Sequence, residues 1–430
     1  MKKVTQVAKS MQKLLNEVAV QAGCVSGLVE RKSKLSADKF VQTLVFGWLA
    51  NKEASLSELT QMASALGVKI SAQGLDKRFS QEAADCLRLV LAKAIENLIS
   101  ADAVAIPVVK KFTEVRLFDS SVVTLPKELT SHWAGSRDSA VKVEVSLDLL
   151  TGTLSGPYLR DASAHDSSGK MQTSALASNS LRLADLGYFD IGRLCELNEE
   201  GVYWISRFHP KALLVTDKPY HLADFLHKQK KAQIDTEVRL GQEQLLPARL
   251  LAVRVRDKQV IKRRLKRSRR KSLSNRRARN RKLLALAHWT VYVTNTPKEI
   301  LSFPEVFALA RARWQIELLF KLWKSHGHID EWRSRKPWRI LCELYAKLIA
   351  MLIQHWTIIV SCWHLPDRSM VKAAQTVRKF ALYLAISFNF LKKLVSALND
   401  LVNVIISGCR INKRKKTPAN FQLLLGEALG

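Results

Sequence analysis

The chain has 430 residues, of which 47% are hydrophobic and only 17 are Gly and 11 Pro, so it can bury a large core in about two to four domains. This composition excludes a disordered basic tail. Lys and Arg together number 69 against 38 Asp and Glu, and the formal net charge of +31 at pH 7 favours a polyanion as the partner.

Residues 1–103 predict a helical domain. Between Lys39 and Ala50, apolar side chains recur at three- and four-residue spacing, which is typical of an amphipathic helix. Ser55 and Glu58 stand in capping-box positions and open the next helix, which we expect to end at Gly67.

A third helix is predicted from Ser71, and this order is typical of a helix-turn-helix with a polar second helix. The candidate DNA contacts on that second helix are Gln73, Lys77 and Arg78. An ordinary helical hairpin fits the same pattern equally well, so both interpretations stay open.

Strand patterns begin after Val104. The apolar segment 115–119 predicts a short strand that ends in Asp119. Residues 141–149 alternate between apolar and polar side chains, as strands do, and the pair 151–152 turns the chain back into another strand.

A second strand with an acidic end follows. We predict a helix near 170–180, a strand over 181–185 that ends in Asp185, a helix over 190–199 and a strand over 202–206. A meander followed by strands that alternate with helices indicates an α/β sheet domain.

Residues 209–287 form a compartment of a different, mainly β character. Short strands are predicted at 212–215, 237–240 and 248–255, and a strongly basic run extends from Lys258 to Lys282. The cations of this run repel one another, so it should be poorly ordered unless phosphates neutralise it, and we favour nucleic-acid contact over a solvated face. The candidate DNA contacts in the run are Arg263, Arg264, Arg267 and Arg270.

The sheet pattern resumes at 289–295, so the preceding compartment looks inserted into one α/β domain, and a long helix is predicted after Pro304. On this helix Arg313, Glu317 and Lys324 are four and seven residues apart, which places them on one helical face. Apolar neighbours predict that most of the helix is buried, which favours a functional role over a surface ion pair. The neighbours expected to be buried are Trp314, Ile316, Leu318, Leu319, Phe320, Leu322 and Trp323.

Three acids in so cationic a chain suggest a metal site, because carboxylates are easily ionised in such a field and are preferred by Mg²⁺. Two Mg²⁺ ions about 4 Å apart can clamp the attacking and leaving oxygens of an in-line phosphoryl displacement. Asp119, Asp185 and Glu317 would supply the bridging and terminal ligands. Arg313 and Lys324 fit as clamps on DNA phosphates.

The helix around Glu317 resembles that of the DDE transposases of bacterial insertion sequences, specifically the fourth insertion-sequence family. That family carries a Tyr-x2-Arg-x3-Glu-x6-Lys signature, and Arg313, Glu317 and Lys324 match its last three members at the required spacing. Ala310 stands at the Tyr position, so any contact made by that Tyr is not expected here, whereas the metal ligands are unaffected.

The segments around the two aspartates resemble the same family. Phe118-Asp119-Ser120 is similar to its first Asp strand, and Ala184-Asp185-Leu186-Gly187-Tyr188-Phe189 is similar to its second. Three separate matches in order make the resemblance specific, and it runs from about Val104 to Leu365.

The resemblance implies an α/β fold with a ribonuclease-H-like catalytic domain over 104–365, interrupted by a mainly β insertion at 209–287 and flanked by helical regions at 1–103 and 366–430. It implies a DDE-type transposase that performs cut-and-paste transposition with Mg²⁺, or with Mn²⁺ in its place. Water first cuts double-stranded DNA at an element end, and the freed 3′-OH then attacks the opposite strand and later the target. Family members stack a flipped base on a Trp at the end of the insertion; Trp289 stands at a matching place, although a core position fits it as well.

The helical region 366–430 is our candidate for the contact of a homodimer, because both element ends must be held together. The apolar stretch 348–363 is interrupted by Gln354 and His355, so we expect a buried helix and no membrane partner. The six Cys lie singly and the chain starts without an apolar signal core. These features favour a cytoplasmic bacterial protein associated with the nucleoid.

Two other classes fit parts of this pattern. A non-catalytic basic nucleic-acid-binding protein would bind DNA or RNA with strong salt dependence and would be indifferent to Mg²⁺. A metal-dependent nuclease on the same fold would cut DNA without rejoining it.

Overall fold

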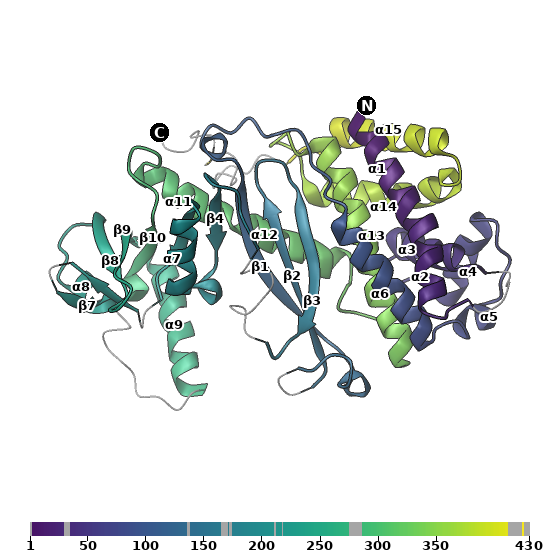
Figure 1. The fold of residues 1–430 in the computed structure, drawn as a ribbon, viewed down its shortest axis with the longest axis horizontal. Helices are drawn as coiled ribbons and strands as arrows, with labels where there is room; N and C mark the ends of the chain where they lie inside the picture. The colour runs from purple at the N-terminus through teal and green to yellow at the C-terminus, as the bar shows by residue number, and fades with distance from the viewer. Residues whose placement is uncertain are drawn as a thin grey trace. The chain divides into compact units, whose positions relative to one another are not determined.

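The computed structural model divides by its contacts into two units, each built from several segments of the chain (Figure 1). The first unit comprises Met1–Ala105, Asp119–Ala164 and Gln315–Thr417. The second unit comprises Ile106–Phe118, His165–Trp314 and Pro418–Gly430. The structure describes residues 2–29, 35–135, 138–164, 171, 174–209, 212–216, 218–274, 286–411 and 424, with the backbone alone in 267–274.

The N-terminal part of the first unit is helical, as predicted. Its helices are α1 (Lys2–Gln12), the π-helix η1 (Lys13–Val18), α2 (Ala19–Val25), α3 (Ala37–Ala50), α4 (Leu56–Ala65), α5 (Ala72–Asp76) and α6 (Gln81–Glu96). The predicted capping box is confirmed, because the backbone N–H of Ser55 donates to the Glu58 carboxylate at 2.7 Å and the Glu58 N–H donates to Ser55 Oγ at 3.3 Å. The second helix of the candidate helix-turn-helix, α5, has only 5 residues.

The centre of the first unit is α13 (Pro337–Cys362), which contacts α1, α3, α6, α14 (Met370–Ser387) and α15 (Leu391–Gly408). Figure 1 shows these helices gathered around it. In the described part of the chain, α13 is the one helix long and apolar enough to cross a membrane, and 94% of its apolar window is buried inside the protein. The prediction of a buried helix is confirmed. The polar residues that interrupt it bond within the core: Gln354 donates to Ala374 O at 3.3 Å and His355 Nε2 to Gly152 O at 2.8 Å.

The first unit also holds an antiparallel hairpin of β2 (Ala140–Asp148) and β3 (Leu154–Asp161). The predicted alternation in β2 is present, but every residue of the strand is buried, including the polar ones. Glu144 is 0% exposed and its Oε1 accepts from Arg160 of β3 at 2.7 Å. A buried charge is tolerated when it is paired, so the neighbouring strand allows β2 to be covered on both faces.

The second unit contains parallel and antiparallel strands. Its strands are β4 (Leu181–Ala184), β5 (Tyr203–Arg207), β6 (Leu213–Val215), β7 (Pro219–His221), β8 (Gln233–Leu240), β9 (Leu246–Arg254) and β10 (Trp289–Thr294). β1 (Val115–Thr124), β4 and β5 pair in parallel. β10 pairs in antiparallel fashion with β5 on one side and with β9 on the other. Over the described residues the strand order is β3-β2-β1-β4-β5-β10-β9-β8-β6-β7.

One of the two helices predicted for the second unit is wrong over the described residues, and the other is confirmed. The helix expected near 170–180 is wrong over 174–180, which form turns and irregular backbone. Here Thr113 Oγ1 donates to Ser178 O at 3.1 Å, and Asn179 has a positive φ of 63° that a helix does not accept. The predicted helix at 190–199 is confirmed as α7 (Ile191–Glu199), and α8 (Leu222–His227) and β7 were not predicted.

The basic run contains a helix, α9 (Lys258–Ser274), which was not predicted; residues 275–282 lie outside the described residues. Lys, Arg and Gln are good helix formers. Asp257 caps the helix by accepting from the N–H groups of Gln259 at 2.7 Å and Val260 at 3.2 Å.

Candidate active site

Asp119 and Asp185 follow two neighbouring parallel strands at the point where their pairing ends. The last register pair of β1 and β4 is Phe118 opposite Ala184, and the next residue in each segment is an acid. β1 continues through 120–124, so the prediction that its strand ends at Asp119 is wrong. These further residues include two Val and a Thr, which favour extended backbone. Only the pairing to β4 stops where the strand end was expected.

Asp185 has one carboxylate oxygen that accepts no hydrogen bond in the described part of the chain. The side chain as a whole is 42% exposed, but Oδ1 itself is buried. Arg207 Nε lies 3.9 Å from this oxygen, which is too far for a hydrogen bond. A buried carboxylate oxygen without a partner costs free energy, and a divalent cation is a partner that it would accept.

Asp119 is half-buried, and its Oδ1 accepts a hydrogen bond from the backbone N–H of Ser120 at 2.9 Å. This bond fixes the carboxylate close to the strand backbone. Asp119 and Glu317 belong to the first unit and Asp185 to the second.

Glu317 lies on α12 (Trp314–Lys321), which follows α11 (Phe303–Ala312) after a break at Arg313. The helical segment predicted after Pro304 is confirmed, with this interruption. Ile316, Leu319 and Phe320 form the buried face of α12, and Glu317 is half-buried beside them. Trp314 is 48% exposed, so its predicted burial is wrong.

Lys324 lies in a π-helical turn, η7 (Leu322–His326), that continues α12. The wider turn shifts Lys324 from the position that a regular helix would give it relative to Arg313 and Glu317. Its Nζ donates to Val122 O of β1 at 2.7 Å and lies 3.8 Å from Asp330 Oδ2. Arg313 is half-buried at the end of α11.

Within the described residues, no group of three or more His, Cys, Asp or Glu side chains lies together in an arrangement that could hold a metal ion. Asp119 lies on β1, Asp185 directly after β4 and Glu317 on α12. Their role as ligands stays a prediction.

Trp289 begins β10 and is only 6% exposed, within a hydrophobic cluster that includes Trp204, Phe208 and Leu250. The guanidinium of Arg254 lies 4.8 Å from the centre of the Trp289 ring. Trp289 therefore occupies a core position in this conformation, which is the alternative to base stacking that the sequence left open. Base stacking stays a prediction.

The candidate DNA contacts of α9 divide into two kinds. Arg263 is exposed, whereas Arg264 is half-buried and donates to Trp289 O at 2.7 Å and to Thr290 Oγ1 at 3.0 Å. Burial, followed by the nearby Arg207, lowers the pKa of Arg264. In this conformation Arg264 ties α9 to β10 and is not free for a phosphate. The side chains of Arg267 and Arg270 lie outside the described residues.

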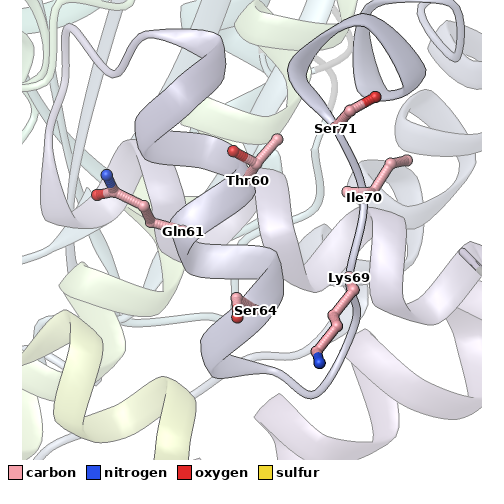
Figure 2. A pocket seen from close by; sticks show the side chains of 6 residues that line it. All are labelled: Thr60, Gln61, Ser64, Lys69, Ile70 and Ser71. Atoms are coloured by element: carbon pink, nitrogen blue, oxygen red, sulfur yellow. The ribbon is translucent and has the colours of Figure 1, made fainter.

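The helical region before residue 103 has a hollow between α4 and the segment that leads into α5. Figure 2 shows Thr60, Gln61 and Ser64 on α4 and Lys69, Ile70 and Ser71 on that segment. Lys77 is exposed and Arg78 half-exposed just beyond α5, where both line a second polar hollow with Ser26 and Ser80. The polar character expected for the second helix is thus present at the surface.

Arg207 beside Asp185 was missed from the sequence. It ends β5, which pairs in parallel with β4, so its side chain comes close to the acid that follows β4. The signal that could have found it is its place at the carboxyl end of a predicted strand next to an acidic one.

Residues 110–353, more than half of the chain, match the family described as the transposase DDE domain. The chain is 28% identical over 369 residues to the transposase for insertion sequence element IS231C of Bacillus thuringiensis subsp. berliner, an alignment that covers 79% of this chain and 76% of that protein. It is 26% identical over 392 residues to the transposase for insertion sequence element IS1151 of Clostridium perfringens, with 84% and 82% covered. The chain therefore belongs to the DDE transposase family and is a DNA transposase of an insertion sequence.

Proposed function

We propose that Asp119, Asp185 and Glu317 hold two divalent metal ions, Mg²⁺ or Mn²⁺, and that the enzyme cuts an element out of DNA and joins it to a target at these ions. The observation that carries this proposal is the buried Oδ1 of Asp185, which accepts no hydrogen bond in the described structure. The strand register supports it further, because Asp119 and Asp185 each follow a residue of the pair Phe118 and Ala184. Successive strand residues point to opposite faces, so both acids face the same side of the sheet.

The donor set fits these cations, since three carboxylates offer hard oxygen ligands with the charge that Mg²⁺ requires. When bound, two such ions clamp the attacking and leaving oxygens of an in-line phosphoryl displacement. Water and the 3′-OH of the cut strand are the nucleophiles, so no side chain of the protein needs to form a bond to DNA.

Arg313 and Lys324 orient the scissile strand by binding its phosphates. Lys324 Nζ now donates to Val122 O at 2.7 Å and lies 3.8 Å from Asp330. A phosphate oxygen would replace these partners when DNA enters. The charged ammonium prefers an anion to a neutral carbonyl, which favours this exchange.

The remaining DNA contacts come from the basic surfaces. We assign contacts with the DNA backbone to Lys77 and Arg78, in the hollow that they line with Ser26 and Ser80, and to Arg263, Arg267 and Arg270 of α9, since a chain of net charge +31 binds phosphates with release of counterions. Arg264 does not contact DNA in this proposal; it anchors α9 to β10 through its bonds to Trp289 O and Thr290 Oγ1. Stacking of a flipped base on Trp289 requires Arg254 to leave the ring.

We assign the sheet β3-β2-β1-β4-β5, with its antiparallel hairpin and three parallel strands, to the ribonuclease-H-like class. Residues 104–365 then form the catalytic domain with 209–287 as its insertion, 1–103 a DNA-binding domain and 366–430 a region for homodimer contact in the complex that joins both ends. The enzyme works on double-stranded DNA at the nucleoid of the bacterial cytoplasm.

The test uses a duplex made from the DNA that flanks the gene. With Mg²⁺ the wild-type protein should nick this duplex and then join it to target DNA, and EDTA should stop both steps. Asp185→Asn should stop cutting. The matched control is Asp190→Asn, because Asp190 caps α7 by accepting from Arg193 N at 2.8 Å and Asn caps equally well. Cutting by Asp185→Asn at the wild-type rate would contradict the assignment, and nicking without joining would indicate a nuclease.

A further inference from the structure

The turn that follows the catalytic helix is held by cations from three other elements of the first unit. Lys52, in the loop between α3 and α4, donates to Ser325 O at 3.4 Å, and Arg378 of α14 donates to His326 O. Lys347 of α13 donates to His328 O at 2.9 Å. The last carbonyls of a helix have no partner within it, and cations are the side chains that best satisfy them.

This turn is also packed too closely to shift freely. A Cβ added at Gly327 would lie 2.5 Å from Trp323 O and 2.7 Å from the sulfur of Met351. His328 has a positive φ of 49°, which residues with a Cβ rarely adopt and which therefore needs support from its surroundings.

Lys52 and Glu53 supply part of that support because both contact the imidazole ring of His328. The His328 side chain is only 12% exposed. Lys52 Nζ contacts Nε2 of the ring. An ammonium can only donate, so Nε2 accepts and the ring proton is on Nδ1. Nδ1 lies 3.3 Å from Glu53 Oε1 and 3.1 Å from Glu331 Oε2, within ion-pair distance but without a hydrogen bond to either in the described structure.

A second tie joins the same two regions. Asp76, the last residue of α5, pairs with Lys336 at 2.5 Å and with Arg339 at 3.3 Å. Arg339 also lies over the ring of Phe79 at 5.3 Å. The candidate helix-turn-helix, α4 and α5, is thus tied to the segment 325–339 at two places, before α4 through Lys52 and at the end of α5 through Asp76.

We propose that Lys52 is a positioning residue of the transposition reaction: it holds the turn after the catalytic helix so that Lys324 meets the scissile strand, and it couples DNA bound at α4 and α5 to that helix. This inference rests on the proposed phosphate contact of Lys324. Lys52 acts one residue away from Lys324, through Ser325 O, and directly through His328. Arg378 and Lys347 hold the same turn from the core.

Lys52 is the residue to test because it is half-buried, so its loss leaves the core intact. Lys347, by contrast, forms a buried ion pair with Glu343 at 2.7 Å, and its replacement would leave an unpaired buried charge. The variants are Lys52→Met, Lys52→Arg, and the control Lys9→Met at an exposed lysine of α1.

The experiment measures single-turnover cutting of the flanking-DNA duplex with Mg²⁺, binding of the same duplex by gel shift, and the thermal unfolding midpoint. Lys52→Met should cut about tenfold more slowly, as small displacements of a substrate-orienting group do, while binding and unfolding stay close to wild type. Lys52→Arg should restore most of the rate, and Lys9→Met should match wild type. Cutting by Lys52→Met at the wild-type rate would overturn the inference.

A double-mutant cycle separates positioning from general damage. If Lys52 acts through Lys324, then Lys52→Met in a Lys324→Met background should cause no further loss of rate. Losses that multiply would show that Lys52 acts independently and would overturn the inference, while the proposed function stands. A wild-type protein that makes no cut, or Lys324→Met that cuts normally, would overturn the proposed phosphate contact and this inference with it.

Discussion

His355 should make the stability of the first unit depend on pH. It lies on α13, is 3% exposed, and donates from Nε2 to Gly152 O at 2.8 Å, which ties the central helix to the β2–β3 turn. Burial lowers the pKa of His355 from 6.5 to about 4, and the bond to Gly152 opposes this only in part. The ring is therefore neutral in the folded protein at neutral pH.

The sign and size follow from linkage. Below pH 6.5 the unfolded chain binds a proton at His355 that the folded chain does not, so the stabilisation is fully present above 6.5 and is lost as the pH falls toward about 4. At about 1.4 kcal/mol per pKa unit, this gap corresponds to a loss of about 3 to 4 kcal/mol in the free energy of unfolding.

The assay is urea unfolding of the wild type and of His355→Gln between pH 7.5 and pH 4.5. Gln keeps a donor for Gly152 O but does not titrate, so the stability advantage of the wild type over the variant should shrink as the pH falls. The same change at the exposed His221 should leave the pH dependence of the wild type unaltered. An advantage that is constant across this range would refute the reasoning.

Four further changes have specific expected results. Glu317→Gln should lower the cutting rate by about a thousandfold because it removes a ligand charge, while gel-shift affinity stays near that of the wild type. Gly152→Ala should destabilise by roughly 3 kcal/mol in urea unfolding, since Gly152 has a φ of 71° and an added Cβ would lie 2.7 Å from the Trp363 ring. Arg263→Gln should weaken DNA binding for all sequences and reduce its salt slope by about 1. Arg264→Gln should instead lower stability by about 2 kcal/mol, measured by urea unfolding, because it loses bonds from a charged donor to Trp289 O and Thr290 Oγ1.

The helices were predictable because their signals are local. The Ser55 and Glu58 capping box and the apolar spacing of 39–50 depend on residues three or four apart, and both are confirmed. The short strands of the second unit other than β7 were found for a similar reason, since alternation and turn residues are read within a few positions.

Features set by distant residues were not predictable. Burial of the polar face of β2 depends on Arg160, which pairs with Glu144 only once the hairpin forms. The basic composition of α9 indicated DNA contact for Arg264, but its partner is the backbone of Trp289 in another element. The amino-acid composition gives the net charge of a segment, but it does not indicate which of its charged side chains bind other parts of the protein instead of DNA.

The candidate site was predictable residue by residue but not as an assembly. The spacing of Arg313, Glu317 and Lys324 indicated a functional helix, yet the π-turn that displaces Lys324 has no local signature. The register of Phe118 opposite Ala184, which aligns the two aspartates, is a long-range pairing that no local pattern defines.

The most direct test of the metal-dependent transposase account is excision from a plasmid that carries the gene with its flanking ends. Purified wild-type protein and Asp119→Ala would each be incubated with the plasmid in Mg²⁺ or in EDTA. The account predicts excision by the wild type with Mg²⁺ alone, and none by Asp119→Ala although it binds the ends equally well. Equal DNA binding by both proteins without cutting under any condition, or excision that persists in EDTA, would contradict it.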